Sequence, residues 1–375
     1  MSKLFVRSKI IFFHLLYLFF IPFWIFQKLI PRKKNIWIFG AWHGIKFSDN
    51  SKVFFLKLVQ HYPEIEAIWL TRDVNIVNEL RSKGFKSYHT NSLRAIFKSL
   101  LAKVVIISSS KSDVNPFFIN GAKLIQIWHG APFKKIGMHV NISIERRVLL
   151  GIQKYLFPFI YEYTYDYVVS TSECFNDILC SSFLIPKENI ISSGYPRNDI
   201  FYKKKEISKI VSMWNKKFNN PKKIIYLPTY RSTKKNTDFF FNYGFDEQNL
   251  INVLEKHNAI FITKGHFSDD QISSSSKSER IINLSDSIIE EINPIIKDID
   301  VLLTDYSGVY FDFLLTHRPI IFKAFDLDYY SESRGLNFDY KSSISGPIAN
   351  NWMDVIMHLE KIFSEKNLFY DKNLI

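Results

Sequence analysis

Short apolar segments alternate with helical segments along most of this chain. Segments such as 35–41 (NIWIFGA), 66–71 (EAIWLT) and 103–109 (KVVIISS) are rich in β-branched and aromatic residues, as strands are. Between them lie stretches with apolar residues at helical spacing, such as 50–62 (NSKVFFLKLVQHY). Apolar strands joined by helices are typical of parallel sheets covered on both faces. The alternation therefore predicts an α/β fold.

The alternation runs in two series, which predicts two domains. The second series begins at 222–231 (KKIIYLPTYR), after a basic segment. A chain of 375 residues is long enough for two domains of ordinary size. We expect a hydrophobic segment over residues 1–34, a first Rossmann-like domain over 35–205 and a second over 206–375. Two such domains facing across a cleft would suit a nucleotide-activated donor.

Residues 10–26 (IIFFHLLYLFFIPFWIF) are apolar apart from His14, and basic residues flank them on both sides. No small-residue cleavage site follows, so a removable signal peptide is not indicated. The apolar length is at the short end of what spans a bilayer, and Pro22 would kink a helix there. Three structures stay open: a membrane-spanning or re-entrant anchor, an interfacial helix, and a helix packed on the protein's own core. In the first two, we expect the chain at the cytoplasmic face of the cell membrane.

The formal net charge is +13, and the lysines and arginines occur in small clusters. Such clusters suit an anionic membrane surface, a phosphate-rich substrate or nucleic acid. Here they lie at predicted sheet edges and loops rather than along one helix, so nucleic acid is not the expected partner. The sequence has no Walker-type loop, no zinc-ligand spacing and no Asp-x-Asp pair, so we expect neither a metal nor a cofactor.

Polar residues follow several predicted strands, at the edge where open α/β sheets bind ligands. His129 ends the strand AKLIQIWHG and precedes Gly130, with Lys134 and Lys135 close behind. A histidine in this position can act as a general base near neutral pH. Taken alone, the stretch also fits a structural histidine and a solvated loop.

Further strand ends carry groups that bind anions. Arg197, in the loop SSGYPRND, offers a planar guanidinium fork for a phosphate. The other groups are hydroxyl, cationic and imidazole side chains: Thr229 and Arg231 in YLPTYR, and Lys264 and His266 in ITKGH. Each of these fits an ordinary loop when taken alone. Together they favour a phosphate-rich donor.

The segment LLTDYSGVYFDFLL has the clearest anion-binding pattern, because Ser307 and Gly308 open a helix directly after an apolar strand. The N–H groups of a helix start attract anions, and Ser307 adds a hydroxyl. Asp305 can orient these donors or cap the turn. Arg334 and Asp339 in RGLNFDY are further candidate ligand contacts, and a loop salt bridge is the alternative for them.

Five motifs in this order, WHGAPFKKIG, GYPRND, LPTYR, TDYSGVYFDF and RPIIF…RG…FDY, resemble the CDP-glycerol glycerophosphotransferase family, which builds teichoic-acid-like poly(polyol phosphate) chains. The resemblance covers about residues 36–345, with departures at Ala131, Phe267 and Gly308. It implies a GT-B arrangement of two Rossmann-like domains, with residues 35–205 on the acceptor side and residues 206–375 binding the CDP-donor. It also implies a peripheral membrane enzyme that uses CDP-glycerol or another CDP-polyol.

The resemblance implies roles for the site residues as well. His129 would be the base and His266 the second essential histidine, while Arg231 and Ser307 would hold the pyrophosphate. A hydroxyl of a lipid-linked glycan or of a growing polyol-phosphate end would attack the β-phosphorus, and CMP would leave. The alternative is a GT-B glycosyltransferase that uses a nucleotide sugar, such as a CMP-sugar, in capsule or surface-glycan synthesis.

Overall fold

The structure is a computed structural model that describes residues 18–159, 161, 163–202, 207–229, 243–264, 278–285, 288–289 and 291–364. Contacts divide the chain into two units. The first comprises Met1–His129 and Ile136–Arg197, and the second comprises Gly130–Lys135 and Asn198–Ile375. The chain thus passes from the first unit to the second directly after His129 and again after Arg197. The boundaries predicted at 34/35 and 205/206 stay predictions.

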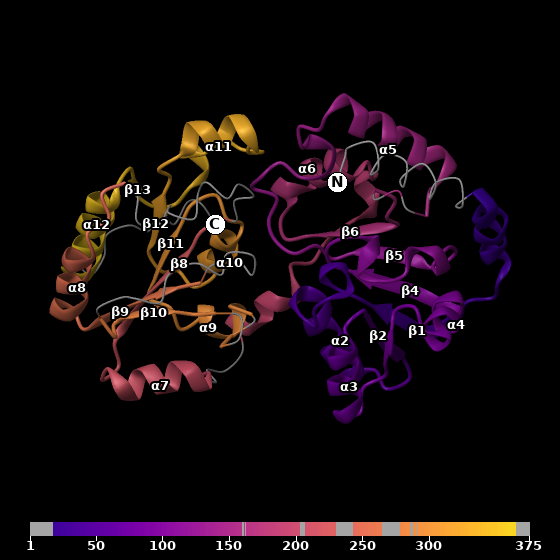
Figure 1. Cartoon of the computed structure of the whole chain (residues 1–375), viewed down its shortest axis with the longest axis horizontal. Coiled ribbons are helices and arrows are strands. Elements are labelled where there is room, and N and C mark those ends of the chain that lie inside the picture. The colour runs from indigo at the N-terminus through magenta and orange to yellow at the C-terminus, as the bar shows by residue number, and fades with distance from the viewer. Residues whose placement is uncertain are drawn as a thin grey trace, which may run out of the picture. The chain divides into compact units, whose positions relative to one another are not determined.

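The first unit is built on a seven-stranded sheet with the order β3-β2-β1-β4-β5-β6-β7 (Figure 1). All of its strand pairs are parallel. The strands are β1 (Lys33–Phe39), β2 (Glu66–Thr71), β3 (Ser87–His89), β4 (Ala102–Ile107), β5 (Lys123–Gln126), β6 (Tyr167–Ser170) and β7 (Ile190–Ser192). The helices are α2 (Asp49–His61), α3 (Val74–Ser82), α4 (Leu93–Leu101), α5 (Ile144–Leu156) and α6 (Asn176–Phe183).

Alternate side chains of each central strand enter cores on opposite faces of the first sheet. In β1, Ile36 and Ile38 pack in the core that includes Ala95 of α4. Phe39 packs instead in the core that includes residues of α2 and α3. Because both faces are covered, the strands are apolar throughout instead of alternating with polar residues. This is the pattern that the sequence analysis recognised.

The second unit repeats this architecture in a six-stranded sheet with the order β10-β9-β8-β11-β12-β13. Its strand pairs are also parallel. The strands are β8 (Lys222–Leu227), β9 (Ala259–Thr263), β10 (Ile281–Asn283), β11 (Val301–Thr304), β12 (Ile320–Lys323) and β13 (Ile348–Ala349). The helices are α7 (Lys209–Lys217), α8 (Glu247–Lys256), α9 (Asn293–Ile296), α10 (Val309–Leu314), α11 (Leu327–Ser333) and α12 (Trp352–Ser364).

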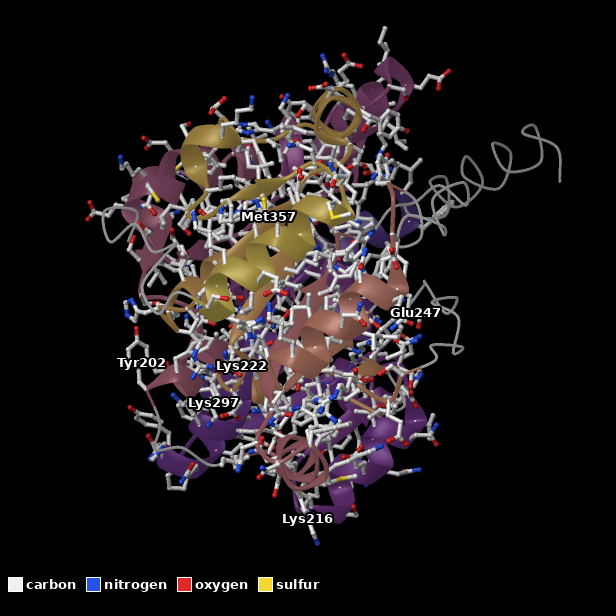
Figure 2. All side chains as sticks on the ribbon, turned by 90° about the vertical axis from the view of Figure 1, so that its left-hand side faces the viewer. Tyr202, Lys216, Lys222, Glu247, Lys297 and Met357 are labelled. Atoms are coloured by element: carbon white, nitrogen blue, oxygen red, sulfur yellow. The ribbon has the colours of Figure 1, made fainter. Side chains whose placement is uncertain are left out.

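Helices α8 and α12 lie side by side on one face of the second sheet, as Figure 2 shows. Glu360 of α12 joins them, because its carboxylate accepts from Lys256 Nζ and lies 2.8 Å from His257 Nε2. Trp352 is buried under this pair, whereas Met357 is exposed. The other face of the sheet forms a separate core with residues of α7, α9 and α10.

Residues 18–26 of the predicted hydrophobic segment are helical, and residues 1–17 lie outside the described part of the chain. The Phe20 ring lies 5.2 Å from the ring of Phe117 and 5.6 Å from that of Phe159, both in the first unit. Phe19 and Phe26 are exposed. None of the helices in the described ranges is long and apolar enough to cross a membrane.

The predicted two-series α/β fold is confirmed, and every strand that the sequence analysis quoted is present with small shifts at its ends. Five helices of the described residues were not predicted: α5, α7, α9, α11 and α12. Helix α7 lies within the stretch interpreted only as a basic segment. Its sequence KIVSMWNKK places Val211 and Trp214 in the core and its lysines toward solvent, so the basic residues hid an amphipathic helix.

Candidate functional site

His129 lies just after β5, at the carboxyl edge of the first sheet, and its ring orientation is defined. The Nδ1 atom lies 2.8 Å from the carbonyl oxygen of Ser108, which follows β4. A carbonyl can only accept, so Nδ1 carries the proton and the Nε2 of a neutral ring has the lone pair. The rings of Trp128 and Trp42 lie 4.1 and 5.3 Å from the imidazole. This is the tautomer that a general base requires.

A buried ion pair holds the backbone around His129. Arg197 donates from one guanidinium nitrogen to Asp49 Oδ1 and to the carbonyl oxygen of His129, both at 2.9 Å. Asn50 donates to the carbonyl oxygen of Trp128 at 2.8 Å and accepts from the Arg197 N–H at 3.1 Å. Both charged side chains are about nine-tenths buried, with 10% of Arg197 and 7% of Asp49 exposed. Arg197, predicted as a phosphate ligand, thus makes its described contacts within the first unit, beside His129.

Burial lowers the pKa of His129 below the usual value for histidine. The charges of Asp49 and Asp113 and the hydrogen bond to Ser108 act in the opposite direction, while Arg197 adds to the lowering. Burial is the largest of these effects, so the neutral ring is favoured. Its Nε2 can therefore accept a proton at neutral pH.

In the second unit, Asp305 joins the ends of two neighbouring strands. Its Oδ1 accepts from the backbone N–H of Thr229, after β8, at 2.8 Å, and from that of Tyr306 at 2.6 Å. Asp305 is fully buried. Ser307 and Gly308 follow and lead into α10, which has only six residues, so the helix dipole is small there. Asp305 therefore orients the two backbone segments that carry the predicted phosphate ligands.

Two buried tyrosines make hydrogen bonds in the region around Asp305. Tyr340 donates from its hydroxyl to the Asp305 carbonyl at 3.2 Å, and Tyr306 donates to Asp326 at 2.9 Å. Burial raises the pKa of both phenols, so they stay neutral donors. Lys264, at the end of β9, donates to the carbonyl of Ile289 at 2.7 Å.

The motif GAPFKK (residues 130–135) belongs to the second unit although His129 belongs to the first. Phe133 is fully buried, and its ring lies 5.7 Å from that of Tyr310. Asn337 donates from its side chain to the carbonyl oxygens of Pro132 and Lys134 at 2.8 and 2.9 Å. The phenylalanine thus anchors the segment to the core of the second unit.

Two of the departures from the family pattern lie against each other in this region. A Cβ atom added to Gly308 would lie 3.0 Å from the carbonyl oxygen of Ala131. A larger residue at position 308 would therefore press on the segment that follows His129.

The remaining predicted contacts have defined places or lie outside the described residues. Lys134 forms an isolated bridge with Leu336 through its backbone, and the Lys135 N–H donates to Gly335. Asp339 accepts from Ser342, which lowers the pKa of the carboxyl group. The backbone of Arg334 ends α11. Arg231 and His266 lie outside the described part of the chain.

The sequence analysis missed the residues that support His129. Asn50 was interpreted only as the start of a helix, and Asp49 and Asp113 were not singled out. One signal was available, because the tripeptide Trp-His-Gly occurs twice, at 42–44 and at 128–130.

Two parallel-sheet α/β units with polar groups at the carboxyl edges of their sheets make up a GT-B-like fold. The sequence model of the CDP-Glycerol:Poly(glycerophosphate) glycerophosphotransferase family matches residues 23–374. The chain belongs to this family. Membership favours the glycerophosphotransferase interpretation over the nucleotide-sugar alternative.

Relatives and solved structures agree with this assignment. The chain is 29% identical over 366 residues to a teichoic acid glycerol-phosphate transferase of Staphylococcus aureus (strain NCTC 8325 / PS 47), covering 93% of this chain and 90% of that one. It is 28% identical to a teichoic acid poly(glycerol phosphate) polymerase of Bacillus spizizenii (strain ATCC 23059 / NRRL B-14472 / W23), covering 92% and 87%. The solved structure of the wall teichoic acid polymerase TagF matches with a TM-score of 0.70 at 21% identity, over 89% of this chain and 82% of that one. This structural likeness concerns the fold.

Proposed function

We propose that this protein transfers a glycerol-phosphate unit, or a related polyol-phosphate, from a CDP-activated donor to a hydroxyl of a membrane-linked acceptor. CMP is released, and the product belongs to a teichoic-acid-like or capsular polymer. Family membership supports the reaction class. The observation that carries the mechanism is the His129 tautomer, whose Nδ1–H donates to Ser108 and so leaves Nε2 as the proton acceptor.

In the proposed step, Nε2 of His129 takes the proton from the acceptor hydroxyl. The acceptor oxygen forms a bond to the β-phosphorus of the donor, and the bond from that phosphorus to the CMP oxygen breaks. The proton then leaves the imidazolium for solvent. Positioning and electrostatic stabilisation supply most of the rate in this kind of transfer.

The donor phosphates are assigned to the second unit as part of the same proposal. The supporting geometry is the hydrogen bond from the Thr229 N–H to Asp305, which links the ends of β8 and β11. Ser307 and Gly308 follow Asp305 closely in the chain. Lys264 ends the neighbouring strand β9. Arg231 and His266 are proposed as further site residues because of the family resemblance. The further substrate contacts that we propose are Lys134, Lys135, Arg334 and Asp339.

We also place the protein at the cytoplasmic face of the membrane. Helix α5 supports this, because its exposed apolar residues lie on one side: Ile144, Val148, Ile152, Tyr155 and Leu156. Leu150 and Gln153 are buried on the opposite side. Arg146, Arg147 and Lys154 add positive charge, as in helices that lie in an anionic interface.

The test is transfer of label from CDP-glycerol that is labelled in its glycerol-phosphate moiety. CDP-ribitol and a CMP-sugar serve as alternative donors, and CMP release is followed in parallel. His129→Ala should reduce transfer by at least about 100-fold, because a positioned general base contributes that much. His61→Ala, at the exposed end of α2, is the matched control. A folded His129→Ala variant that transfers at the wild-type rate would refute the assignment of the base.

A further inference from the structure

The second Trp-His-Gly tripeptide, Trp42 to Gly44, lies at the same sheet edge as the first. It follows β1, which is separated from β5 in the sheet only by β4. Trp42, His43 and Gly44 are three consecutive residues with positive φ, at 47°, 56° and 75°. Such conformations cost on the order of 1–3 kcal/mol for a residue with a side chain, and they concentrate at functional sites.

Defined contacts hold His43 in this conformation. Its N–H donates to Asp113 Oδ1 at 2.7 Å, and its Nδ1 lies 2.8 Å from Ser112 Oγ and 3.2 Å from Ser110 Oγ. The His43 side chain is exposed. The described contacts of the ring use only Nδ1, so its orientation is set through one nitrogen while the ring stays open to solvent.

Apart from the buried carboxylate of Asp113, the side chains around His43 donate hydrogen bonds or carry positive charge. Arg72 donates from its backbone to the Gly44 carbonyl at 2.6 Å, and its exposed guanidinium lies 3.4 Å from the carbonyl oxygen of Ser112. Asp113, the carboxylate beneath them, is fully buried and accepts from His43, from Ser108 and twice from Ser109. Its charge is therefore directed into the protein.

The base lies next to this cluster. The ring of Trp42 contacts the ring of His129 at 5.3 Å, so the loop that carries His43 packs directly against the catalytic imidazole. Ser108, whose carbonyl sets the His129 tautomer, belongs to the same β4 loop as Ser110 and Ser112. The two tripeptides are thus joined through one loop.

We infer that His43, Arg72, Ser110 and Ser112 form a subsite for a phosphodiester group of the acceptor, beside the hydroxyl that His129 activates. The inference rests on the proposed function, in which His129 of the first unit activates the acceptor hydroxyl. Imidazole N–H, guanidinium and hydroxyl groups together match the anionic oxygens of a phosphodiester. An acceptor that already carries one polyol-phosphate unit presents such a group.

His43→Asn tests the subsite, because asparagine tolerates positive φ and its amide can still meet Ser112, while the atom equivalent to Nε2 is lost. With glycerol-phosphate oligomers as acceptor, the acceptor KM should rise at least about tenfold, as expected for losing a hydrogen bond to a charged group. This rise should exceed any change in kcat or in the donor KM. Arg72→Gln should act in the same direction.

Two variants of the first unit serve as controls and should behave as wild type. His61→Asn changes an exposed histidine at the end of α2. Lys103→Gln removes one positive charge at the opposite end of β4 from the Ser108–Ser112 loop. Calorimetric binding of the same oligomers at low salt gives a second readout, with glycerol as the phosphate-free blank.

The results separate this inference from the proposed function. If wild-type protein transfers nothing but binds oligomers in a His43-dependent way, the proposed function fails and the subsite stands. If transfer occurs and both His43→Asn and Arg72→Gln keep the wild-type acceptor KM and binding, the subsite is refuted. An equal rise in the donor KM would also overturn it. If His43→Asn melts at a lower temperature than wild type, the acceptor KM and oligomer binding of Arg72→Gln decide whether the subsite stands.

Discussion

At the scale of single residues, the proposed chemistry depends on which nitrogen of His129 carries the proton. The carbonyl of Ser108 decides this, and Asp49 and Arg197 hold the backbone of the loop in place. Removing either partner of this ion pair would leave a buried charge uncompensated, which is strongly destabilising. The pair therefore links the position of His129 to the stability of the first unit.

The lowered pKa of His129 leads to a prediction for the pH dependence of transfer. A general base must be unprotonated, and an ordinary histidine is half protonated near pH 6.5. Because burial lowers this pKa, the acidic limb of kcat/KM for the acceptor should be centred below about pH 6.5, with more than half of the plateau value remaining at that pH. Initial rates of CMP release across pH 5 to 8 measure this. An acidic limb centred at or above about pH 6.5 would contradict the burial argument.

The lowered pKa of His129 also makes the stability of the folded protein depend on pH. The folded state holds the proton of His129 less tightly than the unfolded chain does, so the unfolded chain binds more protons below about pH 6.5. The contribution of His129 to the free energy of unfolding is therefore fully present above that pH and is lost as the pH falls through the lowered pKa. Melting curves in the same buffers separate loss of the folded protein from loss of the base.

At the scale of elements, both candidate sites are built from loops that follow parallel strands. The loops must approach each other closely, and Gly40, at the end of β1, shows how closely. A Cβ atom on Gly40 would lie 2.3 Å from the carbonyl oxygen of Asp113. Glycine is required there so that the β1 loop and the β4 loop can bring Trp42 and Ser108 to the ring of His129.

Gly40→Ala should destabilise the first unit by about 2 kcal/mol or more, because the added methyl group meets backbone rather than a flexible side chain. The urea midpoint of unfolding measures this. Gly151→Ala is the matched control: it lies within α5, and its Cβ would meet nothing within 4 Å. Alanine is a better helix former, so Gly151→Ala should stabilise by about 0.5–1 kcal/mol. Equal midpoints for the two variants would show that the close approach is not needed.

At the scale of the whole molecule, two units whose sheets share the order of their first six strands carry different surfaces. Helix α5 of the first unit exposes a continuous apolar stripe, with Ile144 81% and Tyr155 78% exposed. A stripe of this kind on a soluble surface marks an interaction site. In the second unit, helix α12 exposes two large apolar side chains, Met353 and Met357, and Met357 is labelled in Figure 2.

Replacing Val148 and Ile152 together by glutamate should weaken binding to vesicles that contain anionic phospholipid by at least about tenfold. Each change removes roughly 1.5–3 kcal/mol of apolar burial and adds repulsion from the lipid head groups. Cosedimentation with vesicles measures the binding, and vesicles of zwitterionic lipid test the role of charge. Met357→Glu is the control for an added charge at an exposed apolar residue. Binding unchanged in the α5 variant would remove the support for this helix as the membrane contact.

The sequence by itself determined the α/β fold, the two series of strands and the edge at which polar residues such as His129, Thr229 and Ser307 lie. These features follow from local periodicity, since a strand buried on both faces must be apolar and parallel strands end at one edge. Helix α5 escaped prediction because its apolar residues are interleaved with arginines and face outward instead of into a core.

Only the tertiary structure decided what each polar residue does. Arg197 meets Asp49 across 148 positions of sequence, and the Ser108 carbonyl that sets the His129 tautomer is 21 positions away. Such contacts depend on the strand order and on the close approach of loops, and local sequence carries no record of either. The motif WHGAPFKKIG illustrates the difference. Its residues are continuous in sequence, yet the fold assigns His129 to one unit and Gly130–Lys135 to the other, because Phe133 packs in the second core.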